Sequence, residues 1–150
     1  MPRPIFYITR ILPSYRVPVL EALNRRLDDR LVVGHGHPPE DSSLGSLLEN
    51  TSTKFEQFEL SNYWIRGETI HAQRYKPLFD AYGPPAVVLA EESPRSISLP
   101  FLLRYARKQG AARVLWGHFT SNYRRFSPWH PFDRYRLEMA RSVEACVCYS

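Results

Sequence analysis

The sequence predicts a Rossmann-like α/β fold of three layers, in which a mostly parallel sheet lies between helices. Apolar runs without clean alternation, such as PIFYIT at 4–9 and AVVLA at 86–90, are typical of strands buried on both faces. Segments with leucines at helical spacing follow both runs. Strands that alternate with helices in this way form parallel sheets, because each parallel connection needs a crossover.

The chain opens with a strand, a helix and a second strand. A helix is predicted at 15–27, because Leu20, Leu23 and Leu27 lie on one of its faces. Pro18 fits its first turn, where the missing N–H costs nothing. The strand predicted at 31–34 then completes a βαβ unit with the strand at 4–9.

The middle of the chain has weaker signals. Residues 37–53 are rich in Pro, Ser, Gly and acidic side chains, which predicts loop with a short helix at 44–48. The partial alternation at 54–60 predicts a strand. A helix is predicted at 70–82, where Pro77 either begins its second half or kinks it.

The second half regains a regular rhythm. Ser98 is the expected cap of a helix that follows the strand at 86–90, and Gly110 ends that helix. Further elements are a strand at 113–117, a helix at 131–142 and a strand at 145–149. We expect the 131–142 helix to turn Phe132, Tyr135 and Met139 inward.

Composition indicates one soluble domain, residues 1–150, with 43% hydrophobic and 23% charged residues. No run is long enough to span a bilayer and the start does not resemble a signal peptide, so we expect a cytoplasmic protein. Cys146 and Cys148 are expected to be reduced packing residues, since two positions on one strand face have no other cysteine to bridge.

The chain is basic, with a net charge of +5 and a pI near 9.4. This charge favours anionic partners, which include nucleic acid, acidic lipid headgroups and phosphorylated substrates. Charge alone does not choose among them.

Three segments follow predicted strands or complete them, and a fourth closes the chain. They are LPSYRVP at 12–18, ESPRSIS at 92–98, VLWGH at 114–118, and the helix from 134 followed by VEACVCYS at 143–150. In their order and spacing they resemble the N-terminal domain of the retaining GT-B glycosyltransferases of family 4. Glu144 or Ala145 stands where that family usually has an aspartate.

The resemblance implies an enzyme of two Rossmann-like domains that face a cleft. The N-terminal domain would hold the acceptor, a glycan, a lipid-linked sugar or another molecule, and the C-terminal domain most of the nucleotide-sugar donor, with no further cofactor. Residues 1–150 would be the acceptor-side domain alone. Because the sequence stops at its last predicted strand, we interpret it as truncated and expect it not to complete a catalytic cycle.

Open α/β sheets bind ligands beyond the carboxyl ends of their strands. Six candidate residues fall there: Tyr15, Arg16, Glu91, Glu92, Arg95 and His118. The resemblance places a histidine near the donor sugar, which makes His118 the catalytic candidate, as a hydrogen-bonding group more than a general base. A structural role is its alternative.

The other candidates are assigned to acceptor binding. Arg16 and Arg95 precede helices, where a guanidinium and free N–H groups can together bind phosphate or carboxylate, and a solvated arginine is the alternative for each. Tyr15 either stacks on a sugar or packs over the sheet edge. Adjacent residues in an extended segment point oppositely, so at most one of Glu91 and Glu92 is expected to face the acceptor.

An aromatic and basic cluster follows the strand at 113–117. Its members are Tyr123, Arg124, Arg125, Phe126 and Trp129. The mixture suits the edge of an anionic membrane at the inner face, and a loop with incidental aromatics is the alternative.

Other functions have less support. A nucleic-acid- or anion-binding module remains the alternative from another class, although no nucleic-acid motif is present and no nucleic-acid partner is expected. No Gly-x-Gly-x-x-Gly follows the first strand, which argues against a dinucleotide-dependent oxidoreductase. His35 and His37 have no neighbouring ligands in the sequence, so we assign no metal.

Overall fold

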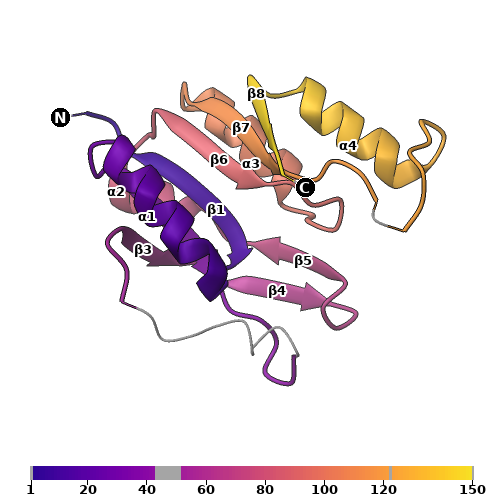
Figure 1. The fold of residues 1–150 in the computed structure, drawn as a ribbon, viewed down its shortest axis with the longest axis horizontal. Coiled ribbons are helices and arrows are strands. Elements are labelled where there is room, and N and C mark those ends of the chain that lie inside the picture. Colours follow the sequence, from indigo (N-terminus) through magenta and orange to yellow (C-terminus); the bar gives the residue numbers. More distant parts are fainter. Residues whose placement is uncertain (1, 43–51, 122, 150) are drawn as a thin grey trace.

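A computed structural model describes residues 2–42, 52–121 and 123–149. Six strands form one sheet in the order β3-β2-β1-β6-β7-β8, and every neighbouring pair is parallel (Figure 1). Their bounds are β1 (Ile5–Ile11), β2 (Leu31–Gly36), β3 (Glu56–Glu59), β6 (Val87–Glu91), β7 (Ala112–Gly117) and β8 (Ala145–Cys148). The α/β class and the strands expected in this sheet are therefore confirmed.

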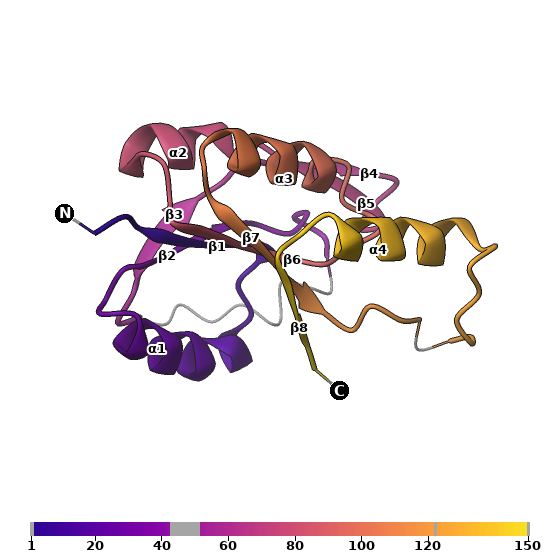
Figure 2. The same ribbon diagram turned by 90° about the horizontal axis from the view of Figure 1, so that it is seen from above.

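Helices cover both faces of the sheet. They are η1 (Ser14–Arg16), α1 (Val17–Arg26), α2 (Lys76–Tyr82), α3 (Leu99–Lys108) and α4 (Pro131–Arg141). In Figure 2, α1 lies on one side of the sheet, and α2 and α3 lie on the other. Within β1, Ile5 and Tyr7 pack on the α1 side, whereas Phe6 and Ile8 join the cluster on the α3 side. Burial on both faces explains why the strand sequence is apolar throughout.

The strand order reverses direction at β1. Chain connections run outward from β1 to β2 and β3 on one side, and from β6 to β7 and β8 on the other. The carboxyl ends of β1 and β6 therefore lie side by side with their connections leading to opposite faces. Such a reversal is where open α/β sheets form a ligand crevice.

The helix predicted at 70–82 is wrong in its first half. Residues Ile70–Gln73 form β5, which pairs antiparallel with β4 (Asn62–Ile65). Arg66 and Gly67, with φ of 54° and 65°, turn the chain between these strands. The helix begins only at Lys76, because Pro77 is suited to a first turn and not to a helix interior. The short helix expected at 44–48 lies outside the described residues.

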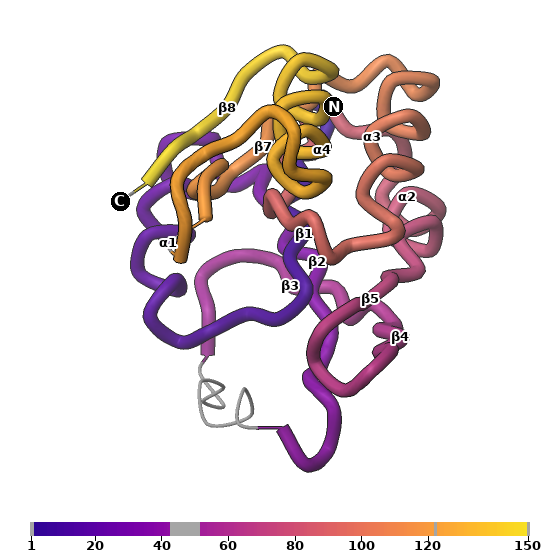
Figure 3. The backbone as a smooth tube through the Cα atoms, turned by 90° about the vertical axis from the view of Figure 1, so that its right-hand side faces the viewer, coloured from indigo at the N-terminus to yellow at the C-terminus, as the bar shows by residue number. Residues whose placement is uncertain are grey.

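The β4–β5 hairpin lies beyond the carboxyl ends of β1 and β2 (Figure 3). Its contact with the start of α3 changes the expected cap of that helix. Ser98 occupies the cap position, but its hydroxyl accepts the N–H of Gln73 at 3.0 Å and makes no capping bond. Gly110 has a φ of 69° just after α3 and ends it as predicted.

Two predictions near the end of the chain also need correction. Phe132 is 47% exposed, so α4 turns Met139 toward the core but not Phe132. Cys146 and Cys148 are free as expected, yet both are exposed, because β8 is the last strand of the sheet and packs little on either face. Across the described ranges, no helix is long and apolar enough to cross a membrane.

Candidate functional site

The β4–β5 hairpin fixes the end of β1. A Cβ at Gly36 would lie 2.3 Å from the Asn62 side chain, so only glycine lets Asn62 come this close. Asn62 Nδ2 then donates to the carbonyl oxygens of Arg10 at 2.7 Å and His37 at 3.0 Å. Gln73 Nε2 donates to the Thr9 carbonyl at 2.8 Å. The last carbonyls of β1 are thus satisfied, which holds Arg10 at the strand-order reversal.

A cleft of about 360 Å³ opens beyond the carboxyl ends of β1, β6 and β7. Four of the six strand-end candidates line it, namely Glu91, Glu92, Arg95 and His118. Tyr123 and Arg124 of the aromatic and basic cluster line it as well. Arg10 and Tyr149 also contribute to the lining. This is the edge of the sheet at which the ligand site was expected.

Glu91 is the centre of a hydrogen-bonded cluster. Its carboxylate accepts from Thr9 Oγ1 at 2.8 Å and from Arg16 Nη1 at 3.1 Å. The Arg16 guanidinium also donates to the hydroxyls of Tyr7 at 2.9 Å and Tyr149 at 3.2 Å. Burial, with a contribution from Glu91, raises the pKa of Tyr7. Arg16 is therefore held by protein groups, where the sequence had predicted it as an anion ligand.

Glu92 turns to the opposite face of the sheet and meets α4. Arg136 Nε donates to its carboxylate at 3.1 Å, and the Glu92 side chain is only 5% exposed. A Cβ at Gly117 would lie 2.6 Å from the Glu92 Cβ, so glycine makes room for this carboxylate. Burial raises the pKa of Glu92, although Arg136 opposes the shift. The alternation expected for this pair is present, yet both carboxylates line the cleft.

Two of the arginines at the cleft have guanidinium groups without a partner in the described part of the chain. Among the residues the structure describes, the guanidinium groups of Arg10 and Arg95 make no hydrogen bond or ion pair. Arg95 is exposed just before α3, where helix N–H groups add positive potential. The cleft therefore presents uncompensated positive charge beside two carboxylates that are already paired, an arrangement suited to an anionic ligand that carries hydroxyl groups.

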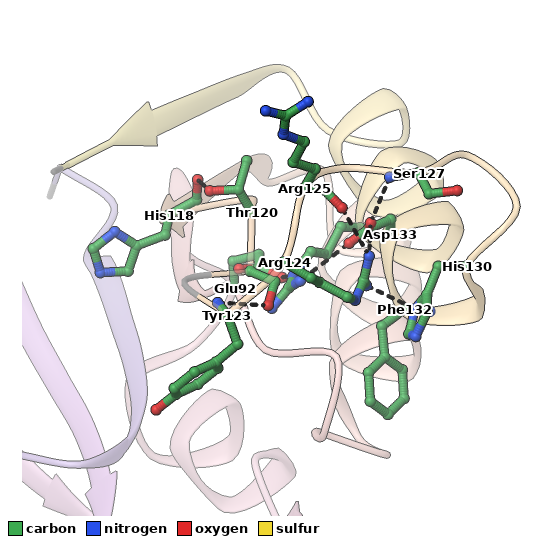
Figure 4. Close-up of polar contacts among 12 residues, drawn as sticks. Glu92, His118, Thr120, Tyr123, Arg124, Arg125, Ser127, His130, Phe132 and Asp133 are labelled. Atoms are coloured by element: carbon green, nitrogen blue, oxygen red, sulfur yellow. Dashed lines mark hydrogen bonds and ion pairs between the residues drawn. The ribbon is translucent and has the colours of Figure 1, made fainter.

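His118 is exposed at the end of β7. Its ring centroid lies 4.2 Å from that of Tyr149, and the two rings are tilted by 53°. In Figure 4 the imidazole points away from the Arg124 guanidinium. Tyr15 is 64% exposed and its ring lies against Arg16, so it stands outside the lining of the cleft.

Comparisons of the chain with protein-family models, with curated proteins and with solved structures gave no match.

The aromatic and basic cluster is split by its contacts. Arg124 donates to Asp133 at 2.5 Å and contacts His130 Nδ1 at 2.7 Å, so its charge is engaged. Hydrogen bonds from Arg124 and from the Ser127 N–H lower the pKa of the fully buried Asp133 to about 2. The other members, Tyr123, Arg125, Phe126 and Trp129, are exposed. Their role at a membrane edge stays a prediction.

The two histidines of β2 and the following loop have local partners. His35 Nε2 lies 3.0 Å from Gln57 Oε1, and His37 Nε2 lies 3.3 Å from Glu59 Oε1. Within the described ranges, no three metal-binding side chains are grouped so as to hold an ion.

Sequence reasoning missed Arg10, Tyr149 and Arg136. Arg10 and Tyr149 stand at or just after the ends of β1 and β8, so the rule that selected His118 would have found both. Arg136 lies inside α4 and reaches the cleft only because that helix packs over the end of β6. No local signal marks it.

Proposed function

We propose that this chain is the acceptor-binding half of a glycosyltransferase of the GT-B type, and that its cleft binds a hydroxyl-rich acceptor with an anionic group. The observation that carries the proposal is the pair Arg10 and Arg95, whose guanidinium groups, within the described residues, have no partner at the ligand-binding edge of a Rossmann-like sheet. The ordered segments at 12–18, 92–98 and 114–118 supply the reason for glycosyl transfer in particular.

The roles of the cleft residues follow from their contacts. Arg95 and Arg10 bind the anionic group, for which planar guanidinium forks are well suited. His118 and Tyr149 present adjoining rings that offer stacking area and polar atoms to a sugar. Glu91 and Glu92 hold the cleft walls through Arg16 and Arg136, so we assign them to positioning.

The apolar part of a lipid-linked acceptor would have a place beside the cleft. A second groove, of about 530 Å³, is lined by apolar side chains that include Ile70, Ile97 and Pro100. Arg95 and Phe132 line both the groove and the cleft. An acceptor with an anionic group at Arg95 could extend an apolar chain into the groove.

The test is a binding titration of the chain with glucose 6-phosphate, inorganic phosphate and glucose, followed by NMR. We expect the sugar phosphate to bind most tightly and to shift the signals of residues 91–95 and 117–121. Arg95→Ala should weaken its binding about tenfold or more, the value of a hydrogen-bonded charge pair. Arg134→Ala removes the same charge from an exposed i,i+4 pair on α4 and should leave the dissociation constant unchanged.

The alternative, a nucleic-acid-binding module, makes the opposite prediction. A short single-stranded oligonucleotide would then bind more tightly than the sugar phosphate, and Arg95→Ala and Arg134→Ala would weaken it about equally, because the attraction is a sum over charges. That outcome would overturn the proposed function. The reading frame beyond residue 150 gives a second test, since a second Rossmann-like domain there supports glycosyl transfer.

A further inference from the structure

A second, smaller pocket lies at the strand-order reversal itself. Apolar side chains of Ile8, Ala90, Leu99 and Leu102 form part of its wall. The polar part comes from β1, β5, β6 and the turn before α3, and includes Arg10, His71, Gln73, Ser93, Ser96 and Ser98. Its volume is about 20 Å³, and a cavity needs roughly 10–15 Å³ to hold one water-sized group. Arg10, Glu91 and Ser93 line both this pocket and the larger cleft, so the two are adjacent.

His71 is the polar group left unsatisfied there. It is only 3% exposed, and its Nδ1 has no hydrogen-bond partner among the described residues. The backbone is held firmly, since His71 N–H donates to the Arg95 carbonyl at 3.1 Å and its carbonyl accepts from Ile97 at 2.9 Å. Trp64 packs against the imidazole, with ring centroids 5.4 Å apart. A buried ring nitrogen in such a fixed frame normally finds a partner.

The ring is neutral at physiological pH. Burial, reinforced by the Arg10 charge and opposed by Glu91, lowers the pKa of His71 to about 4. A neutral imidazole has one nitrogen that donates and one that accepts. The missing partner of Nδ1 must therefore suit whichever tautomer is present.

The serines of the pocket have hydrogens to donate. Ser98 Oγ already accepts from the Gln73 N–H at 3.0 Å, and Ser93 Oγ accepts from the Arg95 N–H at 3.3 Å. Ser96 and Ser98 can share a single hydrogen bond at 3.4 Å, which uses the hydrogen of only one of them. A group that enters the pocket thus meets O–H donors as well as His71.

We infer that this pocket is a subsite for one hydroxyl group of a sugar whose body lies in the larger cleft. A hydroxyl both donates and accepts, so it serves either tautomer of His71 and accepts from the serines. An anionic oxygen would be repelled by Glu91 and a cation by Arg10, both of which line the pocket. The inference rests on the proposed function, because the sugar must first bind in the cleft.

The test compares glucose 6-phosphate with its 2-deoxy, 3-deoxy and 4-deoxy analogues by calorimetric titration. We expect one analogue to bind at least about tenfold more weakly than the parent. The hydroxyl that this analogue lacks is the one that enters the pocket, so its loss leaves buried polar groups unpaired. His71→Leu should reduce that preference to within about twofold. His71→Asn, whose amide lies near the position of Nδ1, should keep most of it.

Thermal unfolding separates this role from a structural one. Since Nδ1 has no partner to lose among the described residues, His71→Leu should melt at or above the temperature of the wild type. If that variant does not fold, the wild type and His71→Asn still give the analogue comparison.

Three outcomes overturn the inference in distinguishable ways. If glucose 6-phosphate binds but all analogues bind equally, the pocket holds an ordered water only and the proposed function stands. If His71→Leu keeps the full preference for the parent over the deoxy analogue, another residue binds the hydroxyl. If no sugar phosphate binds at all, the proposed function fails together with the inference.

Discussion

Glu91 and Glu92 follow one another at the end of β6, and each pairs with an arginine from a different helical layer. Glu91 meets Arg16 beside α1, whereas Glu92 meets Arg136 on α4. The two pairs differ in what else supports them. Arg16 has no carboxylate other than Glu91 among its described partners, but Arg136 also contacts Asp133 at 3.3 Å. Two similarly buried arginines can therefore differ in how far they depend on one carboxylate.

The largest effect is expected at Glu91. Glu91→Ala leaves the Arg16 guanidinium, only 12% exposed, with tyrosine hydroxyls as its remaining polar partners. Removing one member of a buried pair costs about 3–5 kcal/mol of unfolding free energy. Urea denaturation of the variant and the wild type measures it. A loss below about 1 kcal/mol would show that Arg16 finds water instead.

Glu92→Ala should cost less, about 2 kcal/mol, because Arg136 keeps Asp133. Burial also raises the pKa of Glu92, which shows that its charge is partly disfavoured in the folded state. The same urea experiment applies, with both variants measured side by side. If Glu91→Ala and Glu92→Ala lose the same unfolding free energy, then Asp133 does not compensate Arg136 for the loss of Glu92.

Asp133 and Glu92, the carboxylates that bind Arg136, should also differ in how their contributions to stability change at acid pH. The pKa of Asp133 is lowered to about 2, so its contribution is fully present above about pH 4 and is lost as the pH falls from 4 to 2. Glu92, with its raised pKa, has the opposite sign and favours the folded state as the pH falls. Asp133→Asn should therefore flatten the decline of unfolding free energy between about pH 4 and 2. An unchanged slope would assign the acid sensitivity to other groups.

The smallest effect is expected for the exposed pair of α4. Arg134 and Glu138 are 73% and 56% exposed, and pairs of this kind contribute about 0.3–0.5 kcal/mol. Arg134→Ala should thus shift the urea midpoint barely at all. If Arg134→Ala loses as much unfolding free energy as Glu92→Ala, then the exposure of an ion pair does not predict its contribution to stability.

The sequence predicts the sheet well because both-face burial leaves a strong local signal. Runs such as 86–90 are apolar on every residue, and the structure pairs this run on both sides. The sequence did not predict the hairpin strand Ile70–Gln73, because its local signal is weak. It is short, lies outside the main sheet and is followed at once by a true helix, so its pattern blends into the helical one.

The candidate site was predictable in position but not in detail. Strand ends locate Glu91, Glu92, Arg95 and His118 at one cleft without any knowledge of packing. Whether an arginine is free or engaged depends on residues far along the chain, as Arg16 depends on Glu91 and Tyr149. The sequence has no local signal that tells whether a guanidinium is bound by other protein groups, and none that predicts the burial of His71.

The pairing of β1 with β6 also governs how the molecule is made. β1 ends at Ile11 and its neighbour β6 begins at Val87, so half of the chain lies between the two central strands. A sheet whose neighbouring strands are all parallel closes only through long connections, and such non-local pairing folds more slowly than the local contacts of a helical bundle. During synthesis the first βαβ unit must therefore wait, with one edge of β1 uncovered, until β6 has left the ribosome.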